Sequence, residues 1–146
     1  MPIRPPEYEQ VIEALTPVLK NLPGKVVGID GRDGSGKTTL GRFLAWYFNV
    51  SLIETELFLF DGEGFNYRLE EINLIIGVRL SKPRPVIVEG VRLLSLLSQI
   101  GRSADFLIYV KNQKFSGSEA LSHDLHVYEN LHQPETAANF VLGLAH

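Results

Sequence analysis

The chain has 146 residues, of which 45% are hydrophobic and 21% charged, with a formal net charge of −3. This length and balance are typical of one globular domain with a buried core, so we expect residues 1–146 to form a single domain. The small negative charge gives no basic footprint for nucleic acid or an anionic membrane, and the absence of cysteine excludes disulfides and thiolate metal sites.

The sequence carries no targeting signal that we can recognise. No apolar run approaches the roughly 20 residues that span a bilayer. The N-terminal stretch MPIRPPEYEQ is too polar and proline-rich for a secretory signal. We therefore expect a cytoplasmic protein with no membrane or nucleic-acid partner.

The first expected element is a helix over residues 7–22. Its apolar residues recur at helical spacing: Tyr8, Val11, Ile12, Leu15 and Leu19. Pro17 lacks an amide donor and crowds the preceding turn, which predicts a kink or split near Thr16. A turn at Pro23 and Gly24 then leads into a buried strand, KVVGID, over residues 25–30.

Directly after that strand, residues 31–38 read GRDGSGKT and match the phosphate-binding pattern G-x-x-x-x-G-K-[ST], the Walker A motif. Its glycines allow a curl in which backbone amides point at a polyphosphate. The pattern predicts a lysine charge on the terminal phosphates and a hydroxyl ligand to Mg²⁺. A glycine-rich turn that binds nothing would need neither group. We therefore expect these residues to bind nucleotide: Gly31, Arg32, Asp33, Gly34, Ser35, Gly36, Lys37, Thr38 and Thr39.

Strands and helices alternate along the rest of the chain. The loop is followed by a helix, TTLGRFLAWYF, whose aromatic residues we interpret as its core face and end. Further strands are expected at about 51–55, 85–90, 104–110 and 139–143, and further helices at about 67–80, 92–100 and 118–131, with a turn at 134–138. This alternation predicts an α/β fold with a three-layer, doubly wound, mostly parallel five-stranded sheet. In such sheets, ligands bind beyond the carboxyl ends of the strands.

Two acidic sites lie where a nucleotide-bound metal and a substrate would need them. Glu89 follows three buried β-branched residues, where an acid is costly without a partner, and this favours a metal ligand over a carboxylate that merely caps the next helix. Glu54 and Glu56 lie on one face of the strand before it, if strand alternation holds. Either could act as a general base towards a substrate hydroxyl, or both could face solvent.

Two other patterns are less informative. The string at residues 61–64, DGEG, matches the D-x-x-G of GTPases, but PVIVEG fills the corresponding strand better and no N-K-x-D string occurs. We interpret this loop as part of an acceptor-substrate rim. His123 and His126 are three residues apart on an expected helix, but no third metal ligand is evident, and surface histidines are the simpler reading.

The segments GIDGRDGSGKTTL, PVIVEGVRLL and ADFLIYV, with Glu56 and Phe58 after the second strand, resemble the uridine kinase-like branch of the P-loop kinases. That branch includes phosphoribulokinase and pantothenate kinase relatives. The resemblance implies transfer of the ATP γ-phosphate to a hydroxyl of a small molecule, possibly a nucleoside. It also implies that Gly36, Lys37 and Thr38 serve phosphate and Mg²⁺, Glu89 the metal, and Glu56 the place of the branch's base.

The chain departs from the branch in two respects. The base is normally an aspartate, and Glu56 is one methylene longer. Such kinases also close an arginine-bearing lid after the fourth strand, whereas residues 111–146 contain no arginine and the lid segment KNQKFSGS is short. Arg32, Arg68 or Arg92 could substitute, and Arg92 is best placed because it follows Glu89 closely. The alternative function is an ATP-binding module with a reduced lid and little or no turnover.

Overall fold

The computed structural model describes residues 4–62 and 64–145. Five parallel strands form one sheet in the order β2-β3-β1-β4-β5. The strands are β1 (Val26–Gly31), β2 (Ser51–Glu54), β3 (Val86–Gly90), β4 (Phe106–Asn112) and β5 (Phe140–Leu144). The expected doubly wound α/β topology is confirmed, and β1 and β3 are buried along their whole length, as their continuous apolar runs indicate.

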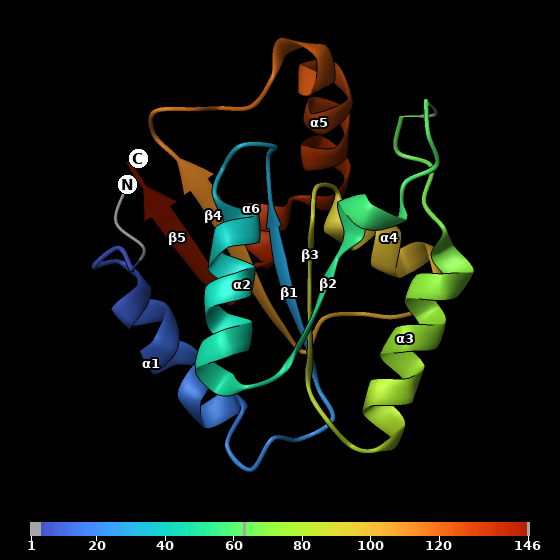
Figure 1. The fold of residues 1–146 in the computed structure, drawn as a ribbon. Coiled ribbons are helices and arrows are strands. Elements are labelled where there is room, and N and C mark those ends of the chain that lie inside the picture. The colour runs from blue at the N-terminus through green and yellow to red at the C-terminus, as the bar shows by residue number, and fades with distance from the viewer. Residues whose placement is uncertain (1–3, 63, 146) are drawn as a thin grey trace.

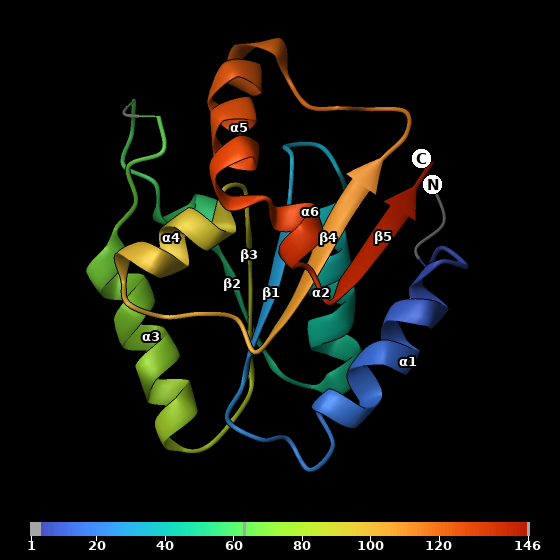
Figure 2. The ribbon, with the colours of Figure 1, turned by 180° about the vertical axis from the view of Figure 1, so that it is seen from behind.

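Helices cover both faces of this sheet, which gives three layers (Figure 1). They are α1 (Tyr8–Val18), α2 (Lys37–Phe48), the 3₁₀ helix η1 (Thr55–Phe58), α3 (Leu69–Ser81), α4 (Leu93–Gln99), α5 (Glu119–His132) and α6 (Pro134–Ala137). Helices α1 and α2 lie on one face, while α3, α4 and α6 lie on the other, as the view from behind shows (Figure 2). Helix α5 rises above the carboxyl edge of the sheet, on the side where the phosphate-loop motif lies.

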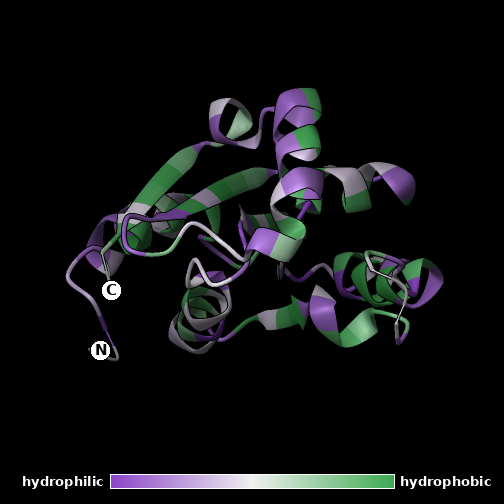
Figure 3. Cartoon of the chain, turned by 90° about the horizontal axis from the view of Figure 1, so that it is seen from above, coloured by the Kyte–Doolittle hydropathy of each residue, from purple (hydrophilic) through white to green (hydrophobic). Residues whose placement is uncertain are grey.

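Each face of the sheet has its own hydrophobic cluster. One lies under α1 and α2 and includes Leu15, Leu44 and Ile108. The other lies under α3 and α4 and includes Ile76 and Leu96. Seen from above, the hydrophobic residues gather in the strands between the helices (Figure 3). Of the described helices, none is long and apolar enough to cross a membrane.

Helix α1 does not end near Thr16, so the predicted split there is wrong. It runs through Pro17 to Val18, and the amide of Leu19 still donates to the carbonyl of Leu15 (2.9 Å). Pro17 removes only the bond to the carbonyl of Glu13, and both residues lie on the exposed side of the helix, where water can take that place.

The expectation that the aromatic residues of α2 form its core face and end is confirmed only in part. Phe43 and Phe48 are partly buried and pack against the core cluster. Trp46 is 74% exposed and Tyr47 is 42% exposed, so these two are not part of the core face. The fully buried residues of that face are Leu40 and Leu44. A helix presents one stripe to a sheet, and the leucines, four residues apart, take it.

Two smaller differences concern segments after strands. The second strand ends at Glu54, one residue earlier than expected, and the chain turns at once into η1. Strand alternation therefore does not fix the direction of the Glu56 side chain. The expected turn at residues 134–138 is the short helix α6, which has Pro134 in its first turn.

Gly90, the last residue of β3, has no room for a side chain. A Cβ there would lie 1.9 Å from the hydroxyl oxygen of Thr55, which is itself buried in η1. We expect Gly90→Ala to lower the free energy of unfolding by about 1–3 kcal/mol, because overpacking forces backbone and side chains apart. Urea denaturation would measure this loss. Gly143→Ala in β5 is the matched control, since nothing lies within 4 Å of its Cβ position, and an equal loss in both variants would contradict this explanation.

Candidate active site

The phosphate-loop motif joins the carboxyl end of β1 to the first turn of α2. Gly34 and Gly36 have positive φ angles of 74° and 102°, which favour glycine and let the chain curl. Gly31 packs closely against β4, because a Cβ there would lie 2.7 Å from the carbonyl oxygen of Val110. The glycines expected from the pattern thus occupy positions where a side chain would be strained or obstructed.

Lys37 begins α2 and bends back over the loop. Its ammonium group donates to the carbonyl oxygen of Arg32 (3.3 Å), and the residue is 7% exposed. Burial lowers the pKa of this ammonium, and the nearby carboxylates of Glu89 and Asp30 oppose that effect. A buried cation held inside the loop is well placed to meet an anion there.

Thr38 and Glu89 meet at the end of β3. The hydroxyl of Thr38 donates to Oε1 of Glu89 (3.1 Å), while the other carboxylate oxygen, Oε2, is buried without a hydrogen-bond partner. Burial raises the pKa of the Glu89 carboxyl, and Lys37 and Thr38 act in the opposite direction. An unpartnered buried carboxylate oxygen is costly, and a cation beside it would remove that cost.

Three carboxylates gather at this edge of the sheet. Oxygens of Glu54, Glu56 and Glu89 all lie within 4.8 Å of one another. Glu54 is held by Arg42 in a two-bond ion pair (2.7 and 3.1 Å), whereas Glu56 is exposed. Oxygen ligands of this kind, beside the Thr38 hydroxyl, suit Mg²⁺. The residues present therefore fit the metal that the sequence predicts.

A hollow of about 320 Å³ adjoins the loop on the side of α2. It is lined by Pro5, Tyr8, Asn112, Leu144 and residues 34–39, which include Ser35 and Thr39. The structure thus brings most of the predicted nucleotide-binding residues to one hollow at the carboxyl edge, where ligands bind in open α/β sheets.

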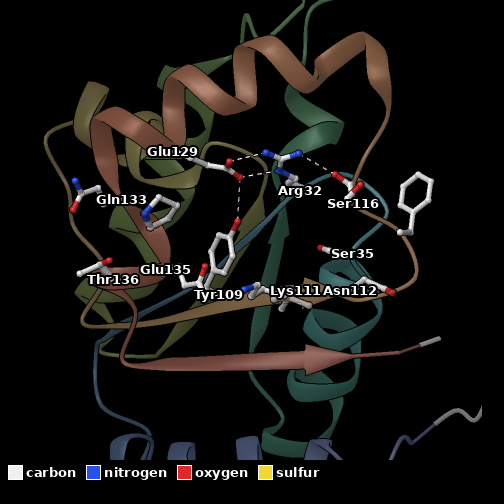
Figure 4. A pocket seen from close by; sticks show the side chains of 13 residues that line it. Arg32, Ser35, Tyr109, Lys111, Asn112, Ser116, Glu129, Gln133, Glu135 and Thr136 are labelled. Carbon is white, nitrogen blue, oxygen red and sulfur yellow. Dashed lines mark hydrogen bonds and ion pairs between the residues drawn. The ribbon is translucent and has the colours of Figure 1, made fainter.

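Residues 113–118 of the lid segment, which follow β4, and helix α5 lie on the other side of the loop. Arg32 donates to both carboxylate oxygens of Glu129 (2.6 and 2.8 Å) and to the carbonyl oxygen of Ser116 (3.1 Å), as Figure 4 shows. The hydroxyl of Tyr109 donates to the same glutamate (3.3 Å). These side chains border a second hollow of about 390 Å³, between α5 and the end of β4 (Figure 4).

Two further contacts join the lid segment to the loop. The amide of Ser118 donates to Oδ2 of Asp33 (2.9 Å). The ring of Phe115 lies against Gly34, so closely that a Cβ there would lie 2.2 Å from it. Arg32 is therefore held by α5 and the lid segment, and Asp33 is held by the lid segment.

Sequence reasoning missed Asp30, the buried acid just before the loop. Its Oδ1 accepts the amide of Gly31 (2.8 Å), and its Oδ2 accepts the hydroxyl of Tyr128 from α5. The amide of Leu94 donates to that same tyrosine hydroxyl (3.1 Å), which links α4, α5 and β1. The signal was present, because an acid inside a buried strand needs a partner, as was argued for Glu89.

The ionisation of Asp30 predicts a pH-dependent stability. Burial raises its pKa to about 6, against 3.8 for an ordinary aspartate. The folded chain therefore binds this proton more tightly than the unfolded chain, so the free energy of unfolding falls as pH rises from about 4 through 6. At about 1.36 kcal/mol per pKa unit, the fall is roughly 3 kcal/mol, and Asp30→Asn is expected to remove it.

Urea denaturation of both proteins at pH 4, 5, 6 and 7 would test this expectation. Asp61→Asn, which alters an exposed carboxylate in a loop, is the control and should keep the wild-type profile. Parallel profiles for wild type and Asp30→Asn would show that Asp30 does not titrate in this range.

The remaining candidate arginines lie over aromatic rings. Arg92 has its guanidinium 4.7 Å from the centre of the Phe65 ring. Arg68 lies over Phe60 at 4.4 Å and pairs loosely with Glu71 (3.9 Å). His123 and His126 are exposed on α5, as expected for surface histidines.

No protein-family model and no curated protein matches this chain. Solved structures do. A possible uridine kinase from Bacillus stearothermophilus is 18% identical with a TM-score of 0.60, over 93% of this chain and 99% of that one. Shikimate kinase from Acinetobacter baumannii, in complex with shikimate, is 15% identical with a TM-score of 0.53, over 87% and 86%. A sugar kinase from Janibacter sp. is 14% identical with a TM-score of 0.51, over 83% and 86%.

The fold is therefore that of the P-loop kinases. Within that class the chain resembles the uridine kinase-like branch, as the residues of the phosphate loop and of β3 indicate. At these identities the likeness concerns the fold, and the reaction has to be argued from the site.

Proposed function

We propose that this protein is an ATP- and Mg²⁺-dependent phosphotransferase that acts on a hydroxyl of a small molecule. The observation that carries the proposal is that a buried lysine, a hydroxyl and three carboxylates lie together at one edge of the sheet. These groups belong to Lys37, Thr38, Glu54, Glu56 and Glu89. A glycine-rich turn that binds nothing would not need this set of side chains.

Each group has a role in the proposed reaction. The amides of residues 33–38 and the Lys37 ammonium would hold the β- and γ-phosphates, and Thr38 and Glu89 would hold Mg²⁺, which would neutralise charge on the phosphates. Glu56, exposed beside this cluster, aligns the acceptor hydroxyl and takes its proton.

Charge on the transferred phosphoryl also calls for an arginine. From the sequence, Arg92 is the first candidate for this role because it follows Glu89 closely. Its guanidinium lies over Phe65, however, whereas Arg32 belongs to the loop itself. We therefore assign this role to Arg32, which has to leave Glu129 when nucleotide enters. The lid would then act by releasing an arginine rather than by supplying one.

The test is a coupled assay of ADP release with Mg²⁺ and a panel of nucleosides and sugars. We expect turnover that depends on an acceptor. A cytoplasmic location, where ATP is available, belongs to the same proposal.

The second candidate function is a nucleotide-binding module without turnover. The observations that favour it are the arginine-free segment after β4 and the engagement of Arg32 by Glu129. Nucleotide binding without any acceptor-stimulated ADP release would support the module.

A further inference from the structure

A third hollow lies beyond the carboxyl end of β3, apart from the phosphate loop. Its volume is about 620 Å³, and its lining comes from the loop before α3, the second residue after β3 and exposed residues of α5. The lining residues are Phe65, Asn66, Arg92, His123, Asp124 and Val127. None of these residues belongs to the phosphate loop.

Arg92 is the half-buried cation of this hollow, and it has an unsatisfied donor. Its Nε is shut off from solvent and has no hydrogen-bond partner. Four other arginines pair with a glutamate, but no carboxylate of residues 4–62 and 64–145 lies within ion-pair distance of Arg92. A guanidinium without a carboxylate partner can bind an anion through its terminal nitrogens.

The position of the guanidinium is fixed by the ring of Phe65, whose centre lies 4.7 Å away. An arginine stacked on an aromatic ring keeps its donor edge free for a planar or tetrahedral anion. Burial raises the pKa of the neighbouring Tyr67 to about 12, and the charge of Arg92 limits that rise. Arg92 is thus a positive charge in a partly apolar setting, where an anion would be held more strongly than in water.

The backbone at Arg92 is also strained. Its φ of 52° and ψ of 38° place it in the left-handed region, which glycine adopts freely and other residues at a cost. The amide of Leu93, next in the chain, donates to Oδ1 of Asp30 in β1 (3.5 Å). This contact holds the turn after β3 against the end of β1. A backbone outlier at a cleft motivates a functional hypothesis for the residue.

We propose that this hollow holds the acceptor by an anionic group, a carboxylate or a phosphate monoester, and that Arg92 is the residue that binds it. His123, on the facing helix, is the second donor. Asp124 is exposed on the same lining and accepts from hydroxyls of the acceptor. The inference rests on the proposed function, because it assumes that the phosphate-loop side is taken by nucleotide, and it makes the acceptor a hydroxyl-bearing anion rather than a neutral nucleoside.

The experiment measures binding, so it does not depend on turnover. The full chain, with Mg²⁺ and a non-hydrolysable ATP analogue, is titrated calorimetrically with three matched pairs: ribose and ribose 5-phosphate, glucose and glucuronate, uridine and uridine 5′-monophosphate. We expect at least one anionic member to bind about tenfold or more tightly than its neutral partner, consistent with the usual contribution of a charged hydrogen bond. The glucuronate pair and the phosphate pairs separate the two kinds of anion.

Arg92→Gln is expected to abolish the preference for the anion and to leave affinity for the ATP analogue unchanged. Glutamine keeps a Cβ, so the backbone strain is the same in both proteins. Arg84→Gln, an exposed arginine at the opposite end of β3, is the matched control and should keep the wild-type preference.

The inference is overturned if neutral members bind as tightly as anionic ones, if no anionic member binds, or if Arg92→Gln keeps the preference. Failure of the proposed function would give a different result. The ATP analogue would not bind, or no ADP would be released. The preference for the anion is a separate measurement and does not depend on ADP release.

Discussion

Lys37→Ala is expected to weaken ATP binding by about 100-fold, which corresponds to nearly 3 kcal/mol. The ammonium is buried within the loop, and charged hydrogen bonds to phosphate are among the strongest that a side chain makes. The loss should exceed that from any exposed lysine, because little water competes at this position. Titration with a fluorescent ATP analogue in the presence of Mg²⁺ would measure it.

The control is Lys111→Ala, which removes an exposed lysine paired with Glu135 (3.0 Å) at the end of β4. It should leave nucleotide affinity within about twofold of wild type, as exposed ion pairs contribute little. Circular dichroism would check that both variants are folded, since loss of Lys37 also removes a cation beside Glu89. Unchanged affinity in a folded Lys37→Ala protein would end the assignment of residues 31–39 as the nucleotide site.

The topology, and the position of the loop motif between β1 and α2, could be predicted from the sequence because their causes are local. Alternating apolar strands and amphipathic helices specify the doubly wound sheet, and the loop pattern fixes which strand is β1. Glu89 was predictable because parallel register places the end of β3 level with the end of β1, with Gly90 opposite Asp30.

The contacts of the lid could not be predicted in this way. Arg32 and Glu129 are 97 positions apart, and α5 carries several charged residues with no pattern that selects one. The place of Phe115 against Gly34 depends on the path of a six-residue connection rather than on periodicity. Even the exposed position of Trp46 follows from a competition between two faces of α2, which composition alone does not decide.

These lid contacts give the proposed reaction a sequence of events. In the proposed reaction, nucleotide in the loop would attract Arg32, and Glu129 would lose its two-bond partner. Glu129 still accepts from Tyr109, so it is not left without a partner when Arg32 moves. The proposed exchange of one set of charge contacts for another would therefore have a limited cost.

Glu56→Gln is expected to lower kcat by about 10²–10³-fold, within the usual range for removal of a general base. Glutamine has nearly the same shape but cannot take the hydroxyl proton, so affinity for ATP should stay within about twofold of wild type. Steady-state ADP release with the best acceptor, together with nucleotide titration, would separate the two effects.

Glu54→Gln is the matched control, because Glu54 belongs to the same carboxylate cluster but is held by Arg42. A loss confined to Glu56→Gln assigns proton transfer to Glu56, whereas equal losses in both variants would indicate that the cluster acts through its total charge on the metal. Glu56→Asp should retain part of the activity, since it keeps a carboxylate and shortens it to the length usual in the uridine kinase-like branch. If Glu56→Gln turned over at the wild-type rate, the base would have to be sought elsewhere at this edge of the sheet.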